Sequence, residues 1–199
     1  MAKKKIYWIR HGESYSNVSN HYDNVLDPDL TQDGIKQCEE LKKKIKLNNL
    51  NNLNKFNSEI DLVIVSPLTR TLETCSIVFS EHIGQVNFVC LEDVREQINK
   101  LCHKRKKKEI LKKKYGFVDF SNLTSNDDNL YTQYNGLEKK SNVVKRCNKF
   151  VELLKNRKET NIVVITHGNF LYPMFNDVLN NIQNKTFFSN CELRIYDLV

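Results

Sequence analysis

The sequence predicts a three-layer α/β/α fold built on a mainly parallel, doubly wound sheet, in a single domain that spans residues 1–199. Short apolar runs alternate with segments whose apolar residues recur at helical spacing, which is the pattern of strands joined by helices. Two of these runs, Ile6–Ile9 and Ile162–Ile165, each lead into a His-Gly pair. Ligands gather beyond the carboxyl ends of parallel strands, so the two histidines are expected to face one crevice.

The first strand is predicted at Ile6–Ile9, and a polar stretch then extends to Pro28. Thr31 is a favourable N-cap for the helix that follows, because its hydroxyl can accept a hydrogen bond from a free backbone amide. The helix is indicated by apolar residues at helical spacing: Ile35, Cys38, Leu41 and Ile45. The asparagine-rich stretch Asn48–Asn57 has low complexity and is predicted to be a surface loop.

A second strand is predicted at Leu62–Val65 and a third at Val86–Cys90. Between them, Ser66 is expected to cap a helix with Pro67 at its first position, where the missing N–H of proline costs nothing. The buried stripe of this helix is expected to comprise Leu68, Leu72, Cys75, Val78 and Phe79.

The C-terminal part continues the same alternation. An amphipathic helix is predicted over Val143–Leu154 and a fourth strand over Ile162–Thr166. Another helix is expected to begin near Asn169 and to carry Pro173 within its first turns. The alternating segment Cys191–Leu198 is predicted to be the last strand.

Residues 92–135 are irregular and basic, with periodicity for one short helix, and are expected to form a cap over the crevice. The net charge of +7 is concentrated here, in Lys104–Lys108 and Lys112–Lys114. Such a charge suits an anionic substrate, and it also suits nucleic acid or a localisation signal. A solvated helix face is an equally good interpretation, because runs of like charge are usually exposed.

The six cysteines form no Cys-x-x-Cys pair and are scattered among apolar positions, as buried thiols in a reducing compartment would be. A reactive role for Cys102, beside Lys104 and Arg105, is the weaker interpretation. The start of the sequence has no signal-type apolar stretch and no apolar run long enough to span a bilayer. A cytoplasmic location without membrane association is therefore expected.

Three motifs carry a resemblance to a known family. They are Arg10–Ser14 with Asn17, Ser66–Arg70, and Thr166–Asn169. In this order, each at the end of an apolar run, they resemble the histidine phosphatase superfamily, which includes cofactor-dependent phosphoglycerate mutases and many phosphatases. The resemblance runs from the first predicted strand to the last.

The resemblance implies that His11 is the nucleophile and becomes a phosphohistidine. It also implies that Arg10, Asn17, Arg70 and His167 hold the phosphate, and guanidinium groups suit this because they stay charged and bind phosphate oxygens in a fork. Further candidates for substrate binding are Ser14, Gly168, Asn169, Lys104 and Arg105.

The leaving alkoxide needs a proton, which the family supplies from an acidic residue just after the third strand. Glu96 is the first candidate here, as the carboxyl of an Arg-Glu pair before a polar turn, and Glu92 and Asp93 are the reserves. A working acid needs a pKa raised toward neutrality. The remaining histidines, His21, His82 and His103, lack metal-ligand spacing and are expected to be structural or exposed. No metal is expected, because Arg and His side chains already supply positive charge.

Phosphatase activity is favoured over mutase activity. The resemblance implies that a mutase would carry a Glu-Arg-His-Tyr-Gly stretch where this chain has Glu96–Lys100, and a paired-arginine segment that Lys104–Lys106 matches only in part. Cofactor-dependent phosphoglycerate mutase is the alternative, and only this alternative needs priming by 2,3-bisphosphoglycerate. The expected partner is a small phosphorylated substrate, nucleic acid is not expected, and a homodimer stays open.

A more remote alternative is an inactive scaffold that binds acidic partners or RNA through its basic segment. The presence of both histidines and both arginines argues against this class. Steep salt dependence of nucleic-acid binding without turnover would favour it.

Overall fold

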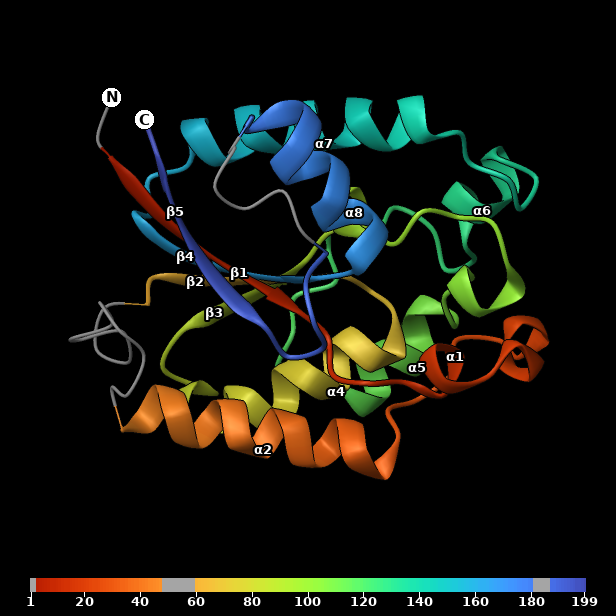
Figure 1. Ribbon diagram of the computed structural model, residues 1–199, viewed down its shortest axis with the longest axis horizontal. Helices are drawn as coiled ribbons and strands as arrows, with labels where there is room; N and C mark the ends of the chain where they lie inside the picture. The colour runs from red at the N-terminus through yellow and green to blue at the C-terminus, as the bar shows by residue number, and fades with distance from the viewer. Residues whose placement is uncertain (1–2, 48–59, 181–186) are drawn as a thin grey trace.

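The computed structural model describes residues 3–47, 60–180 and 187–199, and the predicted loop at Asn48–Asn57 lies outside the described residues. A five-stranded sheet forms the middle layer, in the order β3-β2-β4-β1-β5 (Figure 1). Its strands are β1 (Lys4–Arg10), β2 (Leu62–Val65), β3 (Asn87–Cys90), β4 (Asn161–Thr166) and β5 (Leu193–Leu198). The predicted fold class and the five predicted strands are confirmed, with boundaries that differ by up to two residues.

The register of the sheet brings the two His-Gly segments together. Strand β1 runs parallel to β4, and Arg10 pairs with Thr166 at their carboxyl ends. Strand β2 is parallel to β4 and to β3, whereas β5 is antiparallel to β1. His11 and His167 therefore leave neighbouring strands at the same edge of the sheet.

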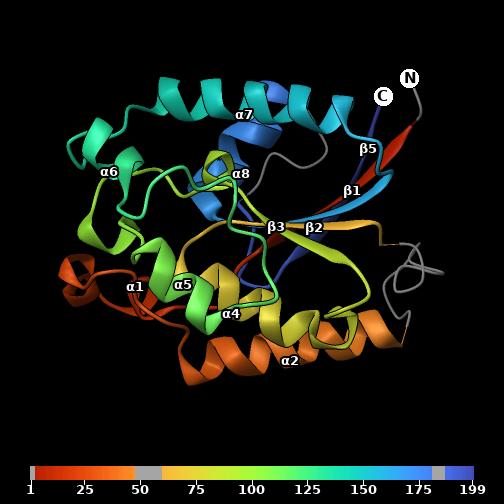
Figure 2. The same cartoon turned by 180° about the vertical axis from the view of Figure 1, so that it is seen from behind.

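Helices cover both faces of the sheet (Figures 1 and 2). On one face lie α2 (Gln32–Lys46) and α4 (Thr69–Val78), and on the other α7 (Lys140–Asn156) and α8 (Gly168–Pro173). Alternate strand residues feed the two cores. In β1, Tyr7 and Ile9 pack toward α2 and α4, whereas Ile6 and Trp8 pack toward α7 and α8. The three predicted layers follow from this alternation.

Short helices lie in the connections between these elements. They include α1 (Tyr15–Val18) and the 3-10 helices η1 (Asn20–Asn24) and η2 (Ser80–His82). A π-helix, η5 (Met174–Val178), continues α8 beyond Pro173, whose missing N–H interrupts the α-helical ladder. Among the described residues, no helix combines the length and the apolarity that a membrane span requires.

The predicted start of the helix after β2 is wrong by two residues, since its first residue is Thr69 rather than Pro67. Ser66 does not cap it, because the Ser66 hydroxyl lies 2.7 Å from His167 Nε2. The helix begins at Thr69, whose backbone N–H and hydroxyl both donate to the carboxylate of Asp27, at 2.8 Å each. A carboxylate distant in sequence thus replaces the expected local cap.

Residues 92–135 form the cap, and it is more ordered than predicted. It contains four short elements instead of one: η3 (Glu92–Val94), η4 (Leu101–His103), α5 (Lys108–Lys114) and α6 (Asn129–Gln133). Buried ion pairs hold it. Arg95 binds Asp128 through two hydrogen bonds of 2.6 and 2.8 Å, with both side chains fully buried, and Arg105 Nε binds Glu92 at 2.7 Å.

A second buried pair ties the cap to α7. Arg146 donates to both carboxylate oxygens of Glu138 at 2.8 Å. The same guanidinium also donates to the carbonyls of Asp93, Arg95 and Glu96, at 2.8, 3.0 and 3.5 Å. One side chain of α7 thus fixes the backbone on both sides of Arg95.

Part of the basic run of the cap is held by contacts within the protein. Lys106 pairs with Asp29 at 3.3 Å and Lys114 pairs with Glu73 at 3.0 Å. Lys108 donates to the carbonyl of Leu123 at 2.7 Å. No residue of Lys104–Lys108 or Lys112–Lys114 lines the cavity that lies beyond the carboxyl ends of β1 and β4.

Candidate active site

A cavity of about 210 Å³ lies beyond the carboxyl ends of β1 and β4. Its walls come from the loop after β1, the start of α4, the cap and the start of α8. The lining residues are Arg10, His11, Ser16, Asn17, Asp23, Arg70, Glu96, Asn99, Lys100, Cys102, His103, Gly168, Asn169 and Phe187.

Both ring nitrogens of His11 are held, Nδ1 by the backbone of the loop and Nε2 by a side chain of α4. Nδ1 lies 2.6 Å from the carbonyl oxygen of Gly12, so Nδ1 carries the proton and donates it there. Nε2 accepts a hydrogen bond of 3.3 Å from Arg70 Nε. This tautomer leaves the Nε2 lone pair facing the guanidinium group that the resemblance assigns to phosphate binding. The sequence could not identify Gly12 as the partner.

Charge and burial keep His11 neutral. Burial lowers the pKa of His11 well below its usual value, and the positive charges of Arg70 and Arg10 lower it further. The ring is almost completely buried, with 1% of its surface exposed. A neutral imidazole with a free electron pair is the form that nucleophilic attack requires.

His167 lies behind His11, with 5.0 Å between the ring centroids. Its Nε2 is 2.7 Å from the Ser66 hydroxyl, and its Nδ1 has no hydrogen-bond partner among the described residues. Burial lowers the pKa of His167 well below its usual value, and Arg70 adds to the effect. A neutral ring that accepts from Ser66 would carry its proton on Nδ1, as an unused donor.

Two guanidinium groups supply the positive charge of the cavity. Arg70 is buried and donates from one terminal nitrogen to the carbonyl of Cys102 at 3.1 Å. Arg10 donates to the carbonyl of Phe188 at 2.6 Å, and its Nε lacks a partner within the described ranges. Both groups are held by backbone carbonyls, which orient them without neutralising them.

Glu96 is the acidic side chain of the cap that lines the cavity close to these arginines. Burial raises its pKa above the usual value for a carboxyl, although Arg70, the Gln97 backbone N–H and Arg10 oppose the shift. The two reserve acids lie elsewhere. Glu92 pairs with Arg95 and Arg105, and Asp93 pairs with Lys149 at 3.1 Å.

The structure contradicts the placement of three predicted substrate-binding residues. Ser14 is fully buried and its hydroxyl lies 2.9 Å from Ser16 Oγ and 3.1 Å from Asn17 Oδ1. Lys104 lies over the ring of Tyr131, with Nζ 5.5 Å from its centroid. Arg105 is buried in its ion pair with Glu92, so none of the three lines the cavity.

Five other candidates for phosphate or substrate binding do line it: Arg10, Asn17, Arg70, Gly168 and Asn169. Asn17 and Asn169 place amide groups at the wall, and Gly168 brings the start of α8 against the guanidinium of Arg10. His167 is fully buried beside His11 and is not part of the wall.

The motifs did not identify several polar residues at the mouth. Ser16, Asn99 and the ion pair of Asp23 with Lys100, 3.0 Å long, all line the cavity. His103, which was expected to be structural or exposed, lines it too. Burial and the charge of Arg70 lower the pKa of His103 to about 3. Helix η1 and the loop before η4 bring these residues together from distant parts of the sequence, and no local signal marks them.

Among the described residues, no group of three or more His, Cys, Asp and Glu side chains is placed to hold a metal ion.

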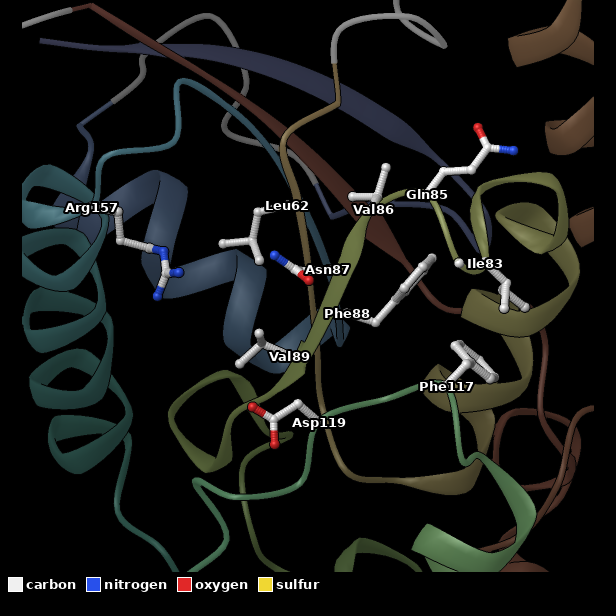
Figure 3. A pocket seen from close by; sticks show the side chains of 11 residues that line it. Leu62, Ile83, Gln85, Val86, Asn87, Phe88, Val89, Phe117, Asp119 and Arg157 are labelled. Carbon is white, nitrogen blue, oxygen red and sulfur yellow. The ribbon is translucent and has the colours of Figure 1, made fainter.

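A larger cavity, of about 700 Å³, lies along edge strand β3 (Figure 3). Its walls include Phe88, Phe117, Asp119 and Arg157. Both charged groups already have local partners. Asp119 accepts hydrogen bonds from the backbone and hydroxyl of Ser121, and Arg157 pairs with Glu159 at 2.8 Å. With neither a nucleophile nor a free charge, this cavity is not a candidate for catalysis.

A family model described as the histidine phosphatase superfamily, branch 1, matches residues 6–198. The chain belongs to the histidine phosphatase superfamily. Phosphoglycerate mutase-like protein 1 of Arabidopsis thaliana is 28% identical to this histidine phosphatase family member. The match covers 96% of this chain and 79% of the Arabidopsis protein.

Solved structures share the histidine phosphatase fold. The ecdysone phosphate phosphatase of Bombix mori, solved with tungstate, matches with a TM-score of 0.65 at 17% identity, covering 96% of this chain and 88% of that one. A phosphoserine phosphatase mutant of Entamoeba histolytica, solved with phosphoserine, matches with a TM-score of 0.55 at 18% identity, covering 96% and 89%.

Proposed function

We propose that this histidine phosphatase superfamily member hydrolyses small phosphomonoesters through a phosphohistidine intermediate on His11. One observation carries the proposal. The Gly12 carbonyl holds the proton of His11 on Nδ1, so Nε2 keeps its electron pair directly against Arg70. A nucleophile beside a fixed cation in a polar cavity is the arrangement that phosphoryl transfer needs.

In the first step, the phosphate group binds to Arg10 and Arg70, which screen its negative charge. Its oxygens take over the hydrogen bond that Arg70 Nε now gives to His11, and the free N–H donors of Arg10 and His167 add to the cradle. Nε2 of His11 attacks phosphorus, and the bond between phosphorus and the alcohol oxygen breaks. Glu96 gives its proton to that oxygen, so the product leaves as a neutral alcohol.

In the second step, the ionised Glu96 accepts a proton from water. The resulting hydroxide attacks phosphorus, the bond to His11 Nε2 breaks, and inorganic phosphate leaves. His11 and Glu96 return to their starting states, so the cycle consumes one water molecule per ester. Burial of Glu96 supports this dual role, because it raises the pKa of the carboxyl toward the range in which both forms are accessible.

The size of the cavity supports a small substrate. Its volume of about 210 Å³ is below the range of roughly 300–1,000 Å³ that drug-sized ligands occupy. Beyond the phosphate cradle, the walls are polar and include Ser16, Asn99 and the Asp23–Lys100 pair. A short, polar alcohol fits these walls better than a long apolar one.

Mutase activity is the second candidate, since the Arabidopsis relative is named phosphoglycerate mutase-like. A mutase must protect its phosphohistidine from water until the product rebinds. The cap stretch Glu96–Lys100, which differs from the mutase pattern, supports hydrolysis instead.

The test is a screen of small phosphomonoesters with the intact protein, combined with rapid acid-free quenching of a labelled substrate. We expect turnover and an adduct that is labile to acid and stable to base, as a phosphohistidine is. His11→Ala should abolish both, whereas His21→Ala, at an exposed histidine outside the cavity, should retain both. Near wild-type turnover by His11→Ala would refute the mechanism.

A further inference from the structure

Two free thiols meet directly behind the loop that carries His11. Cys38 lies on α2 and Cys191 lies just before β5, and their sulfur atoms are 3.4 Å apart although 153 residues separate them in sequence. Cys38 is completely buried and Cys191 is half-buried. No similar sulfur contact joins any of the other four cysteines, all of which are described.

This dithiol packs against the backbone of the loop. A Cβ placed on Gly12 would lie 2.8 Å from Cys38 Sγ and 3.3 Å from Cys191 Sγ, so only glycine fits between the sulfurs and the loop. The backbone N–H of Cys191 donates to the carbonyls of Arg10 and His11, at 3.1 and 3.3 Å. The thiols are therefore one residue away from the carbonyl that fixes the His11 tautomer.

A shared anchor gives a second connection between the dithiol and the loop. The Thr74 hydroxyl accepts a hydrogen bond of 3.0 Å from the Gly12 N–H and one of 3.7 Å from Cys38 Sγ. Any change at Cys38 is thus transmitted to Gly12 through Thr74 as well as by direct contact.

We propose that Cys38 and Cys191 are a modification site, which a small peroxide closes reversibly to a disulfide, and that the closed form turns substrate over more slowly. The disulfide needs a sulfur–sulfur distance of about 2.05 Å, so the two atoms must approach by only about 1.4 Å. The effect on turnover rests on the proposed function, whereas the oxidation itself does not.

The chemistry balances with hydrogen peroxide as the two-electron oxidant. Cys191 is the thiol that the oxidant can reach, and it becomes a sulfenic acid as the peroxide bond breaks and one water is released. Cys38 then attacks that sulfur, the S–O bond breaks, and the hydroxyl leaves as a second water with the Cys38 proton. Both sulfurs are oxidised by one electron each, and a thiol such as dithiothreitol reverses the reaction.

The contact between the two thiols lowers the pKa of Cys38 and raises the pKa of Cys191, so Cys191 keeps the shared proton and Cys38 is the thiolate that attacks in the second step. Cys191 is the first to react because it is partly exposed, whereas Cys38 is completely buried. Cys75, Cys90 and Cys147 are also buried and have no second sulfur in contact, so these three are not expected to form a disulfide under the same treatment.

The test is mild oxidation of the whole protein with hydrogen peroxide, followed by peptide mapping without reduction. We expect a peptide that links Cys38 to Cys191 and weighs two hydrogen atoms less than its parts, and it should disappear with dithiothreitol. Turnover should fall by about tenfold or more, because displacement of a catalytic group by about 1 Å costs up to about a hundredfold. Reduction should restore it.

Cys191→Ser is the decisive variant and Cys147→Ser its control, since Cys147 donates to the Phe170 carbonyl in a distant core. The first should resist inactivation by peroxide, and the second should behave as wild type. Failure of the linked peptide to form in the wild type would overturn the proposal, as would equal inactivation of Cys191→Ser. If the reduced protein hydrolyses no ester, the proposed function has failed. In that case two measurements still test the proposal for Cys38 and Cys191: the linked peptide should form on oxidation, and the affinity for inorganic phosphate should differ before and after it.

Discussion

At the scale of single residues, one physical cause acts in opposite directions on the two groups proposed for catalysis. Burial disfavours charge on both, so it lowers the pKa of His11 and raises that of Glu96. The result is a neutral base and a carboxyl that holds its proton to higher pH than usual. These are the protonation states in which the first step starts.

The pH profile should reflect this pair. Activity needs neutral His11, so it should rise as the pH passes the lowered pKa of His11. It needs protonated Glu96, so it should fall as the pH passes the raised pKa of Glu96. In Glu96→Gln, the alkaline limb of kcat/KM attributable to the carboxyl should be lost.

The same variant should slow esters with poor leaving groups far more than an activated aryl ester, because a phenolate departs without a proton. Equal losses on both substrates would assign the proton to another group.

Arg70 and His167 are expected to stabilise the charge of the transition state. Arg70→Ala and His167→Ala should each lower kcat by about a hundredfold or more, the scale of losing one preorganised donor. Arg157→Ala removes a guanidinium outside this cavity and should leave kcat unchanged. Steady-state kinetics decide the matter, since a change in KM alone would mean that the two residues only bind substrate.

The sequence could predict those site residues that lie within motifs, because a strand end fixes where they must be. His11, Arg10 and Glu96 are of this kind, and all three line one cavity. Residues that arrive through long-range packing could not be found. Lys100 lines the cavity because the cap brings it next to Asp23. Arg105 does not line the cavity, because it is buried in an ion pair with Glu92.

At the scale of elements, the cap is held by buried ion pairs as well as by apolar packing against the core. Burial alone would raise the pKa of Asp128, but hydrogen bonds and the charge of Arg95 outweigh it, so the pKa of Asp128 is lowered. The stabilisation from this carboxylate is therefore complete above its unfolded pKa of about 3.9 and is lost as the pH falls through the lower folded value.

Asp128→Ala should lower the free energy of unfolding by about 3–5 kcal/mol, because it leaves Arg95 buried without its main partner. Asp127→Ala is the matched control, since its pair with Lys107 is exposed and should be worth less than about 1 kcal/mol. Denaturant unfolding at neutral pH measures both. The difference between wild type and Asp128→Ala should shrink in acid, and a difference that persists at low pH would contradict the assignment.

Periodicity predicted the long helices and the strands well, because each buries a continuous stripe against the sheet. It failed where a single distant side chain decides the outcome. The helix after β2 starts at Thr69 because the carboxylate of Asp27, far away in sequence, caps it. Such a contact leaves no local pattern in the sequence.

At the scale of the whole molecule, the strand order explains why one cavity collects all three motifs. Strands β2, β4 and β1 are adjacent and parallel, so their carboxyl ends deliver Arg70, His167 and His11 to the same edge. The motifs alone were enough to predict the family. They could not predict which alcohol the substrate carries, since that depends on cavity walls that the cap and η1 build together.

Because the cap stretch Glu96–Lys100 differs from the mutase pattern, hydrolysis should exceed isomerisation when the substrate is a monophosphoglycerate. Phosphate release and product isomers can be measured in one assay, with and without 2,3-bisphosphoglycerate. Isomerisation faster than hydrolysis by tenfold, about 1.4 kcal/mol in barrier height, would make the protein a mutase.

The hydrogen bonds from Arg146 to the cap backbone bear on which step of the catalytic cycle limits kcat. Its guanidinium donates to the backbone carbonyls of Asp93, Arg95 and Glu96, so the wall that carries Glu96 is fixed before any substrate arrives. Entry and exit then need no large rearrangement of that wall, and the chemical steps set the pace. Added glycerol or sucrose, which slow large motions by friction, should leave kcat nearly unchanged in the wild type. In Arg146→Met, which frees this backbone, kcat should fall and become sensitive to the viscosity of the solvent.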